Sequence, residues 1–252
     1  MQLAKPIGQR PLPCVPLAVT LPNRKLPPTT TSATLRVKLD LAAPALHAAT
    51  AALWRPVGLR SRYVEYLYAM HALIRASVPL LERAALRCTD LPSGDPLAGP
   101  LRQYFEAHAE EERGHDEWLL VDLAAAGADP AAALSRLPAL VVAELAGAQY
   151  YWIEHYHPVA LLGYILVLEG NAPAPWLADR LAELTDLPPA AFRTLRDHAE
   201  LDSGHIAALD GLLDALPLTP TQQAALAVSG LHTADGIIRL FRQLSTRPGG
   251  SR

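Results

Sequence analysis

The sequence predicts an all-α fold, a bundle of about seven helices. Beyond residue 50, Ala, Leu, Glu and Arg dominate, apolar residues recur at spacings of three and four, and alternating β-branched residues are nearly absent. Half of the 252 residues are apolar, which is enough for one large core. We therefore expect a single helical domain over residues 51–246, followed by a flexible tail over residues 247–252.

An N-terminal arm is expected over residues 1–50. Its first part carries prolines at positions 6, 11, 13, 16, 22, 27 and 28. Proline disfavours helix and lacks the N–H group that a strand needs, so this part is predicted to be poorly ordered. The segment Thr34–Asp40 then alternates apolar and polar residues, which predicts a strand-like piece along the main body.

Helix start and stop signals divide the rest of the chain. The pattern predicts helices over about residues 61–88, 97–126, 130–156, 157–170, 176–184, 186–216 and 221–245. Asp129 suits a helix N-cap and Pro130 the first helical position. Gly127 and Gly170 are typical stop residues, and the loop 91–96 contains two prolines and a glycine.

Charge and cysteine content narrow the classes of function. The formal net charge is −3 and the 22 basic residues are scattered, which argues against a nucleic-acid face or a basic membrane anchor. Cys14 and Cys88 form no Cys-x-x-Cys pattern, and the prolines near the start interrupt any signal-peptide run. The longest apolar run, Val159–Leu168, is about half the length that spans a bilayer. We expect a cytoplasmic protein with a small-molecule substrate.

Two eight-residue segments match, His108-Ala-Glu-Glu-Glu-Arg-Gly-His115 and His198-Ala-Glu-Leu-Asp-Ser-Gly-His205. At about 100° per residue, the first histidine, the acid at position five and the last histidine share one helix face. Two such faces together suit a pair of iron or manganese ions, and zinc could also bind. Alternatively, the run of Glu110–Arg113 is simply a solvated face. Two copies among only nine histidines favour the metal site.

Glu169 is the next candidate ligand, because it ends the apolar run that starts at Ala160. A carboxylate near a buried helix surface needs a partner, and a metal would supply one. The alternative is a half-exposed Glu169 at the helix end. His155 and His157 are rival ligands, although their spacing of two residues prevents both from joining one site on a regular helix.

Together these segments resemble the haem-oxygenase-like diiron oxidases, also called iron-containing redox enzymes, which are related in fold to thiaminase II and the PQQ-synthesis oxidase. The similarity extends over roughly residues 55–245 and includes Gly163-Tyr-Ile-Leu-Val-Leu-Glu169-Gly. It implies a haem-oxygenase-like bundle and the metal ligands His115, Glu169, His198, Asp202 and His205.

The chain departs from the family pattern at one position. Family members commonly have a glutamate seven residues before the histidine that corresponds to His115, and this chain has His108 there. Either His108 is a ligand, or Glu111 or Glu112 supplies the missing carboxylate. The full candidate set is His108, Glu112, His115, Glu169, His198, Asp202 and His205.

The expected function is that of an O2-dependent non-haem diiron oxidase or oxygenase with two iron ions, manganese being possible, and O2 as co-substrate. The resemblance implies an amino acid, amine or fatty-acid-like substrate in a natural-product pathway, with N-oxygenation, desaturation or C–C cleavage as outcomes. An external electron donor could be a further partner. The alternatives are a non-enzymatic metal-binding or scaffold protein, which could form a homodimer, and a metal-independent, thiaminase-like member of the fold. A haem-oxygenase reading would use His71 as the proximal ligand.

The substrate pocket is expected beside the metals, between the first and last helices. Its candidate lining residues are Tyr66, Tyr68, His71, Arg75, Tyr151, Trp152, Tyr164, Ser229, His232 and Arg239. An arginine there could hold a substrate carboxylate with two parallel hydrogen bonds. The simpler interpretation is that these residues pack in the core.

Overall fold

The computed structural model of the chain describes residues 29–246, except for the side chains of Asp202 and Ser203. The predicted disorder of the proline-rich arm concerns mainly residues 1–28, and the predicted tail spans residues 247–252; both lie outside the described residues. No helix in the described part is long and apolar enough to cross a membrane.

Residues 29–246 contain α-helices and two short 3-10 helices, and no strand is found in this range. The α-helices are α1 Thr31–Leu39, α2 Ala43–Leu53, α3 Leu59–Ile74, α4 Ser77–Thr89, α5 Ala98–Glu112, α6 His115–Ala125, α7 Pro130–Ser135, α8 Leu140–His155, α9 Leu161–Glu169, α10 Leu177–Thr185, α11 Arg193–Ala215 and α12 Pro220–Thr246. The 3-10 helices are η1 Pro158–Ala160 and η2 Pro189–Phe192. The all-α prediction is therefore confirmed.

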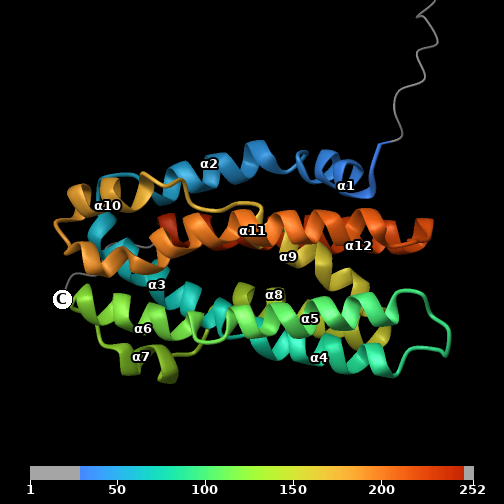
Figure 1. Ribbon diagram of the computed structural model, residues 1–252. Helices are drawn as coiled ribbons and strands as arrows, with labels where there is room; N and C mark the ends of the chain where they lie inside the picture. Colours follow the sequence, from blue (N-terminus) through green and yellow to red (C-terminus); the bar gives the residue numbers. More distant parts are fainter. Residues whose placement is uncertain (1–28, 247–252) are drawn as a thin grey trace, which may run out of the picture.

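The long helix α12 runs through the bundle and contacts α1, α2, α8 and α9 (Figure 1). Helices α4 and α5 pack side by side on another part of the bundle, and α3 packs against α6. Helix α9 is buried along nearly its whole length, from Leu161 to Glu169. The apolar run before Glu169 is thus a core helix, and it carries the carboxylate into the interior.

Helices α9 and α12 cross at two glycines. A Cβ atom on Gly163 would lie 2.2 Å from the Leu226 carbonyl oxygen and 2.9 Å from the Gly230 nitrogen. A Cβ atom on Gly230 would in turn lie 2.7 Å from a Leu39 methyl group and 3.1 Å from the Gly163 oxygen. Only glycine allows the two backbones to approach so closely. This contact fixes α9, and with it Glu169, relative to α12.

Three predicted helices are each divided in two. The first becomes α3 and α4, because the ring of Pro79 would clash with the Arg75 carbonyl in a continuous helix. The second becomes α5 and α6 at Gly114, whose φ of 84° is left-handed. The third becomes α7 and α8 around Pro138, which disfavours helical geometry in the residue before it. The other predicted helices are present within a few residues of their expected bounds.

The predicted strand over Thr34–Asp40 is wrong, because residues 31–39 form α1. Helix α1 buries Ser32 and Leu35, whereas Val37, an apolar member of the alternating pattern, is 68% exposed. Packing against α11 and α12 therefore overrides the local alternation. The boundary expected at residue 50 falls inside α2, which packs on α12.

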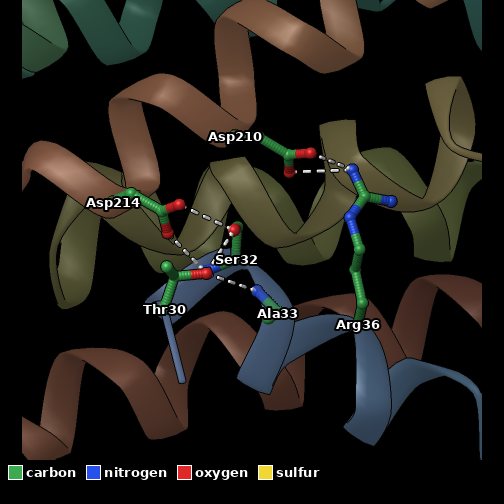
Figure 2. Close-up of polar contacts among 6 residues, drawn as sticks. All are labelled: Thr30, Ser32, Ala33, Arg36, Asp210 and Asp214. Carbon is green, nitrogen blue, oxygen red and sulfur yellow. Dashed lines mark hydrogen bonds and ion pairs between the residues drawn. The ribbon is translucent and has the colours of Figure 1, made fainter. Parts of the chain in front are cut away.

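Polar contacts attach α1 to α11 (Figure 2). The backbone N–H of Ser32 donates to Asp214 at 2.8 Å, and the Ser32 hydroxyl lies 3.0 Å from the same carboxylate. The Arg36 guanidinium donates to both oxygens of Asp210, at 2.7 and 2.8 Å. Ser32 and Arg36 are four residues apart on one face of α1, and Asp210 and Asp214 are four residues apart on one face of α11. The two helices therefore pair through faces with the same spacing of polar groups.

Candidate metal centre

The two matching segments and the end of α9 meet at one place in the bundle. His108 and Glu112 come from α5, His115 from the start of α6, Glu169 from the end of α9, and His198 and His205 from α11. Their side chains form two groups. The first ligand group is His108, Glu111, Glu169 and His205, and the second ligand group is Glu112, His115 and His198.

Short contacts connect the members of the first ligand group. His108 Nε2 lies 2.6 Å from Glu169 Oε1, and His108 Nδ1 lies 3.3 Å from Glu111 Oε2. His205 lies 3.6 Å from Glu111 through Nε2 and 3.7 Å from Glu169 through Nδ1. The rings of His108 and His205 meet edge to face with their centroids 5.0 Å apart. Two imidazoles and two carboxylates thus converge within reach of one ion.

The second ligand group repeats this arrangement beside it. His115 Nδ1 lies 3.4 Å from Glu112 Oε1, and the rings of His115 and His198 are 5.1 Å apart and nearly perpendicular. Trp118 packs on His115 with the ring centroids 4.0 Å apart. The side chain of Asp202, which is also predicted as a ligand, lies outside the described residues.

Glu112 and Glu169 join the two groups. One ligand atom each from His108, Glu112 and Glu169 lies within 4.8 Å of the others, although Glu112 belongs to the second group. Both carboxylates are largely buried, with side chains only 11% and 10% exposed. Buried carboxylates between imidazoles are the ligand set expected for two adjacent iron or manganese ions.

The proton positions on two histidines differ. Nδ1 of His198 donates to the Thr194 carbonyl oxygen at 2.9 Å, because a carbonyl oxygen can only accept, and this leaves Nε2 with a free lone pair. Burial lowers the pKa of His198, so the ring is neutral at pH 7. Burial also acts to lower the pKa of His108, but the hydrogen bond and charge of Glu169 outweigh it and raise the pKa to about 9.

The electrostatics and the unpaired atoms of the two ligand groups fit a bound cation. Burial disfavours ionised Glu112, but its close contact with the His115 imidazole and the charges of the nearby imidazoles outweigh that effect and lower the pKa of Glu112. Within the described residues, His115 Nδ1, His205 Nδ1 and Glu169 Oε2 are buried without a hydrogen-bond partner. Unpaired buried polar atoms are costly, and several in one cluster indicate an absent binding partner. The residues present therefore fit a metal ion.

Local structure explains how each segment presents its histidines. Helix α11 is continuous, and the buried carboxylate of Asp122 accepts the Thr194 N–H at 3.0 Å near its first turn. Helix α5 instead ends at Glu112, and Gly114 turns the chain so that His115 starts α6. The prediction that residues 108–115 form one face of a single helix is wrong, yet the side chains of Glu112 and His115 still contact each other across the break.

A cavity of about 560 Å³ opens onto the two ligand groups. His108, Glu112, Glu169 and His198 lie in its wall together with residues from α2, α3 and α12. The sequence predicted a pocket beside the metals between the first and last helices of the main domain, and the position of the cavity confirms this. Among the predicted lining residues, only Tyr66 and Tyr164 belong to its wall.

The rival ligands and several predicted pocket residues have other surroundings. His157 Nδ1 accepts the Val159 N–H at 3.1 Å, and its Nε2 lies 3.5 Å from Asp95. His155 is exposed on α8 and contacts Tyr151. Neither histidine lines the cavity. The sequence reasoning missed Trp118 and Thr194, which support His115 and His198, because only the folded arrangement shows these contacts.

Comparisons with known proteins place the chain in a family. No curated protein matches it. A Shewanella denitrificans domain of unknown function with a heme oxygenase-like fold is similar in structure, with 19% identity, a TM-score of 0.66, and coverage of 84% of this chain and 88% of that one. A TenA homolog from Pseudomonas syringae pv. tomato has 14% identity, a TM-score of 0.65, and coverage of 86% and 93%. A CADD-like protein of unknown function from Nostoc punctiforme has 14% identity, a TM-score of 0.57, and coverage of 83% and 97%.

These structures show that the fold is haem-oxygenase-like. The sequence profile described as that of an iron-containing redox enzyme matches residues 64–235, which include the ligand residues of α5, α6, α9 and α11. The chain therefore belongs to the iron-containing redox enzyme family.

Proposed function

We propose that this protein is an O2-dependent non-haem diiron oxidase or oxygenase acting on a small molecule. The observation that carries the proposal is the pairing of two histidine and carboxylate groups, joined by Glu112 and Glu169, at the wall of one internal cavity. A storage or purely structural metal site has no need of a cavity that opens onto its ligands.

The ligand types favour iron over other metals. Four imidazoles and three carboxylates face one another, and no cysteine lies among the residues that line the cavity in the described part of the chain. Mixed imidazole and carboxylate ligands suit iron and manganese, whereas a structural zinc site usually contains thiolates and has all four positions closed. Iron bound there with open positions would supply O2 activation.

The surrounding side chains position the ligands and limit access of water. Thr194 fixes the tautomer and the orientation of His198, and Trp118 covers His115. Leu67 and Leu119 are at most 1% exposed in the cavity wall, so this part of the wall keeps water away from the buried ligands on the cavity side. An apolar wall of this kind strengthens charge interactions and protects reactive species from solvent.

The two other readings of the fold have less support. A thiaminase-like reaction needs a nucleophilic cysteine beside the substrate, but burial raises the pKa of Cys88 to about 12 and Cys88 does not line the cavity. A haem site would need an accessible proximal histidine, and His71 is 1% exposed and lies outside the cavity wall.

Anaerobic reconstitution tests the proposal. The purified protein is loaded with ferrous iron, freed of excess iron, and exposed to O2 while iron content and O2 uptake are measured. We expect about two iron ions per chain and O2 uptake by the reduced protein. His205→Ala should lose at least one iron and the uptake, whereas His155→Ala, at an exposed position outside the site, should keep both. Wild-type protein that binds less than half an iron per chain would contradict the proposal.

A further inference from the structure

We propose that Asp122 positions the second ligand group: its buried carboxylate holds the start of α11 against α6, and this fixes the Thr194 carbonyl group that orients His198. The inference rests on the proposed function, because it concerns a ligand group that is itself proposed to bind metal. Asp122 does not line the cavity and is not one of the ligands, so it is a positioning residue. Its hydrogen bonds, the register of two helices and its burial support the inference.

Two successive hydrogen bonds connect Asp122 with His198. The Thr194 backbone N–H donates to Oδ2 of Asp122 at 3.0 Å. The carbonyl oxygen of the same threonine accepts from Nδ1 of His198 at 2.9 Å. Both bonds meet on one residue, so whatever holds the Thr194 backbone also holds the imidazole ring. A metal-binding histidine usually has such a partner on the ring nitrogen that does not bind the metal.

Helices α6 and α11 contact each other at two levels. At the first level, the rings of His115 and His198 lie 5.1 Å apart, and at the second the Asp122 carboxylate meets Thr194. Asp122 is two turns after His115 on the same face of α6. Thr194 is one turn before His198 on α11. The contact at the second level therefore limits how far the two histidine-bearing helices can slide or turn against each other.

The start of α11 is capped from α6 and not by its own N-cap residue. That residue is Phe192, whose side chain cannot accept a hydrogen bond. The first N–H groups of a helix have no partner within the helix, and an N-cap oxygen usually accepts one of them. A serine at the N-cap could satisfy the Thr194 N–H but would leave α6 free. Capping by Asp122 satisfies the N–H group and also joins the two helices.

Asp122 is completely buried, which makes this contact exclusive. The residue is 0% exposed, and Thr194 is 5% exposed. Burial raises the pKa of Asp122, whereas hydrogen bonds from Thr194 and Arg193 at the start of α11 act to lower it. A buried carboxylate needs such donors, because no water replaces them. The carboxylate and the helix start therefore hold each other in one arrangement.

Loss of the Asp122 carboxylate should loosen the first turn of α11. The Thr194 N–H would then have no partner, and the carbonyl group of this residue would no longer be held beside Nδ1 of His198. The ring could turn, and its proton could move from Nδ1 to Nε2, the nitrogen that is free to bind metal. The first ligand group should be affected less, because His205 lies about two turns further along α11.

Nitrogen-15 NMR of the histidine rings tests the first step on metal-free protein. His198→Gln identifies the signals of His198, which we expect to be protonated at Nδ1 in the wild type at pH 7. Asp122→Ala should shift most molecules to the tautomer with the proton on Nε2. Asp214→Ala is the matched control, because Asp214 accepts the Ser32 backbone N–H at 2.8 Å near the other end of α11. It should leave the His198 signals unchanged.

Cobalt titrations followed by visible absorption test the second step. They are made in a His205→Ala background, which disables the first ligand group so that the absorption reports the second. Asp122→Ala should weaken cobalt binding about 10- to 100-fold and change the shape of the absorption bands. Asp122→Asn keeps an oxygen that can accept the Thr194 N–H, so it should restore most of the affinity. Asp214→Ala should bind cobalt like the background protein.

The outcomes separate this inference from the proposed function. Asp122→Ala protein whose His198 keeps the proton on Nδ1 overturns the inference. Equal losses of cobalt affinity in Asp122→Asn and Asp122→Ala would assign the effect to charge and also overturn it. Wild-type protein that binds no metal, combined with the expected shift of the His198 tautomer, contradicts the diiron proposal alone. Thermal unfolding checks each variant, and Asp122→Ser, with a shorter side chain, replaces Asp122→Ala if that variant does not fold.

Discussion

The segments 108–115 and 198–205 share His, Ala, Glu, an acid, Gly and His at the same spacing but have different backbones. In α11 the second segment is one continuous helix, whereas the first is broken between α5 and α6 at Gly114. Nevertheless their histidines pair crosswise, with ring centroids 5.0 Å apart for His108 and His205 and 5.1 Å apart for His115 and His198. The pairing of helices, rather than an unbroken stripe on each, brings the ligands together.

The break also separates the acidic residues of the first segment. Glu112 is turned inward to the second ligand group, with its side chain 11% exposed. Glu111 stays at the rim, with its side chain 55% exposed, and still lies 3.3 Å from His108 and 3.6 Å from His205. The broken segment can therefore offer one carboxylate to each metal ion. A single continuous helix face, as the sequence predicted, would offer only one carboxylate in total.

The largest effect is expected from Glu169, which lies between histidines of both segments. Glu169→Gln keeps the size but removes the charge that two cations would share, so iron content should fall from about two to below one per chain. Glu111→Gln, at the exposed rim, should lose less than half an iron. Iron analysis after gel filtration measures both. Equal losses in the two variants would show that Glu169 has no special position.

A pH dependence should distinguish the two ligand groups. Without metal, His108 has its pKa raised to about 9, so a metal ion that binds there at pH 7 must displace a proton. Protons compete less as the pH rises, and affinity at the first group should increase about tenfold per unit from pH 7 to 8.5. Because the pKa of His198 is lowered, this histidine is already neutral at pH 7 and should add no such pH dependence to metal affinity at the second group. Manganese titrations followed by electron paramagnetic resonance test this.

His108→Gln provides the control for that measurement. The variant should lose the steep pH dependence along with most of the affinity at the first group. If the slope persists in the variant, another group in the site takes up the proton, and the assignment to His108 is wrong.

The two glycines that precede His115 and His205 should give stability changes of opposite sign when each is replaced by alanine. Gly114 has a φ of 84°, so Gly114→Ala is expected to destabilise the fold by about 1 kcal/mol. Gly204 is exposed and helical in α11, with nothing within 4 Å of an added Cβ, so Gly204→Ala should stabilise by about 0.5–1 kcal/mol. Chemical denaturation measures both. The same sign for both variants would contradict the broken and continuous backbones.

The smallest effect concerns the support of α11 by α1. Asp210→Asn weakens the paired hydrogen bonds with Arg36, and because both side chains are about one third exposed the loss should be only about 0.5 kcal/mol. Asp179→Asn, which breaks a more exposed pair with Arg196 near the other end of α11, should cost less. Differential scanning calorimetry compares the two. A larger loss for Asp179→Asn would indicate that α1 does not support α11.

Local sequence patterns predict the helices well where the pattern repeats over several turns. The apolar runs of α9 and α12 and the stop signals at Gly127 and Gly170 correspond to the observed elements. The breaks were missed although their causes are visible in the sequence, since Pro79 and Gly114 lie inside strongly helical surroundings. The strand prediction for α1 failed because the burial of Leu35 depends on α11 and α12, which no local pattern reports.

The candidate site is predictable from sequence in its ligands and not in its surroundings. Histidine spacing depends on helix geometry, so His108, His115, His198 and His205 are identified from the sequence alone and are found together. The cavity wall depends on how α2, α3 and α12 cross, and for that reason most of the predicted pocket residues do not line it. The sequence left Glu111 and Glu112 as alternatives, and only the fold shows that Glu111 contacts His108 and His205 while Glu112 contacts His115.

The central claim is that the two segments jointly hold two metal ions. Anomalous X-ray diffraction at the iron edge, on crystals grown anaerobically with ferrous iron, tests it most directly. We predict two separate peaks, one within the first ligand group beside His108, His205 and Glu169, and one within the second beside Glu112, His115 and His198. A single peak, or peaks away from these side chains, would contradict the account.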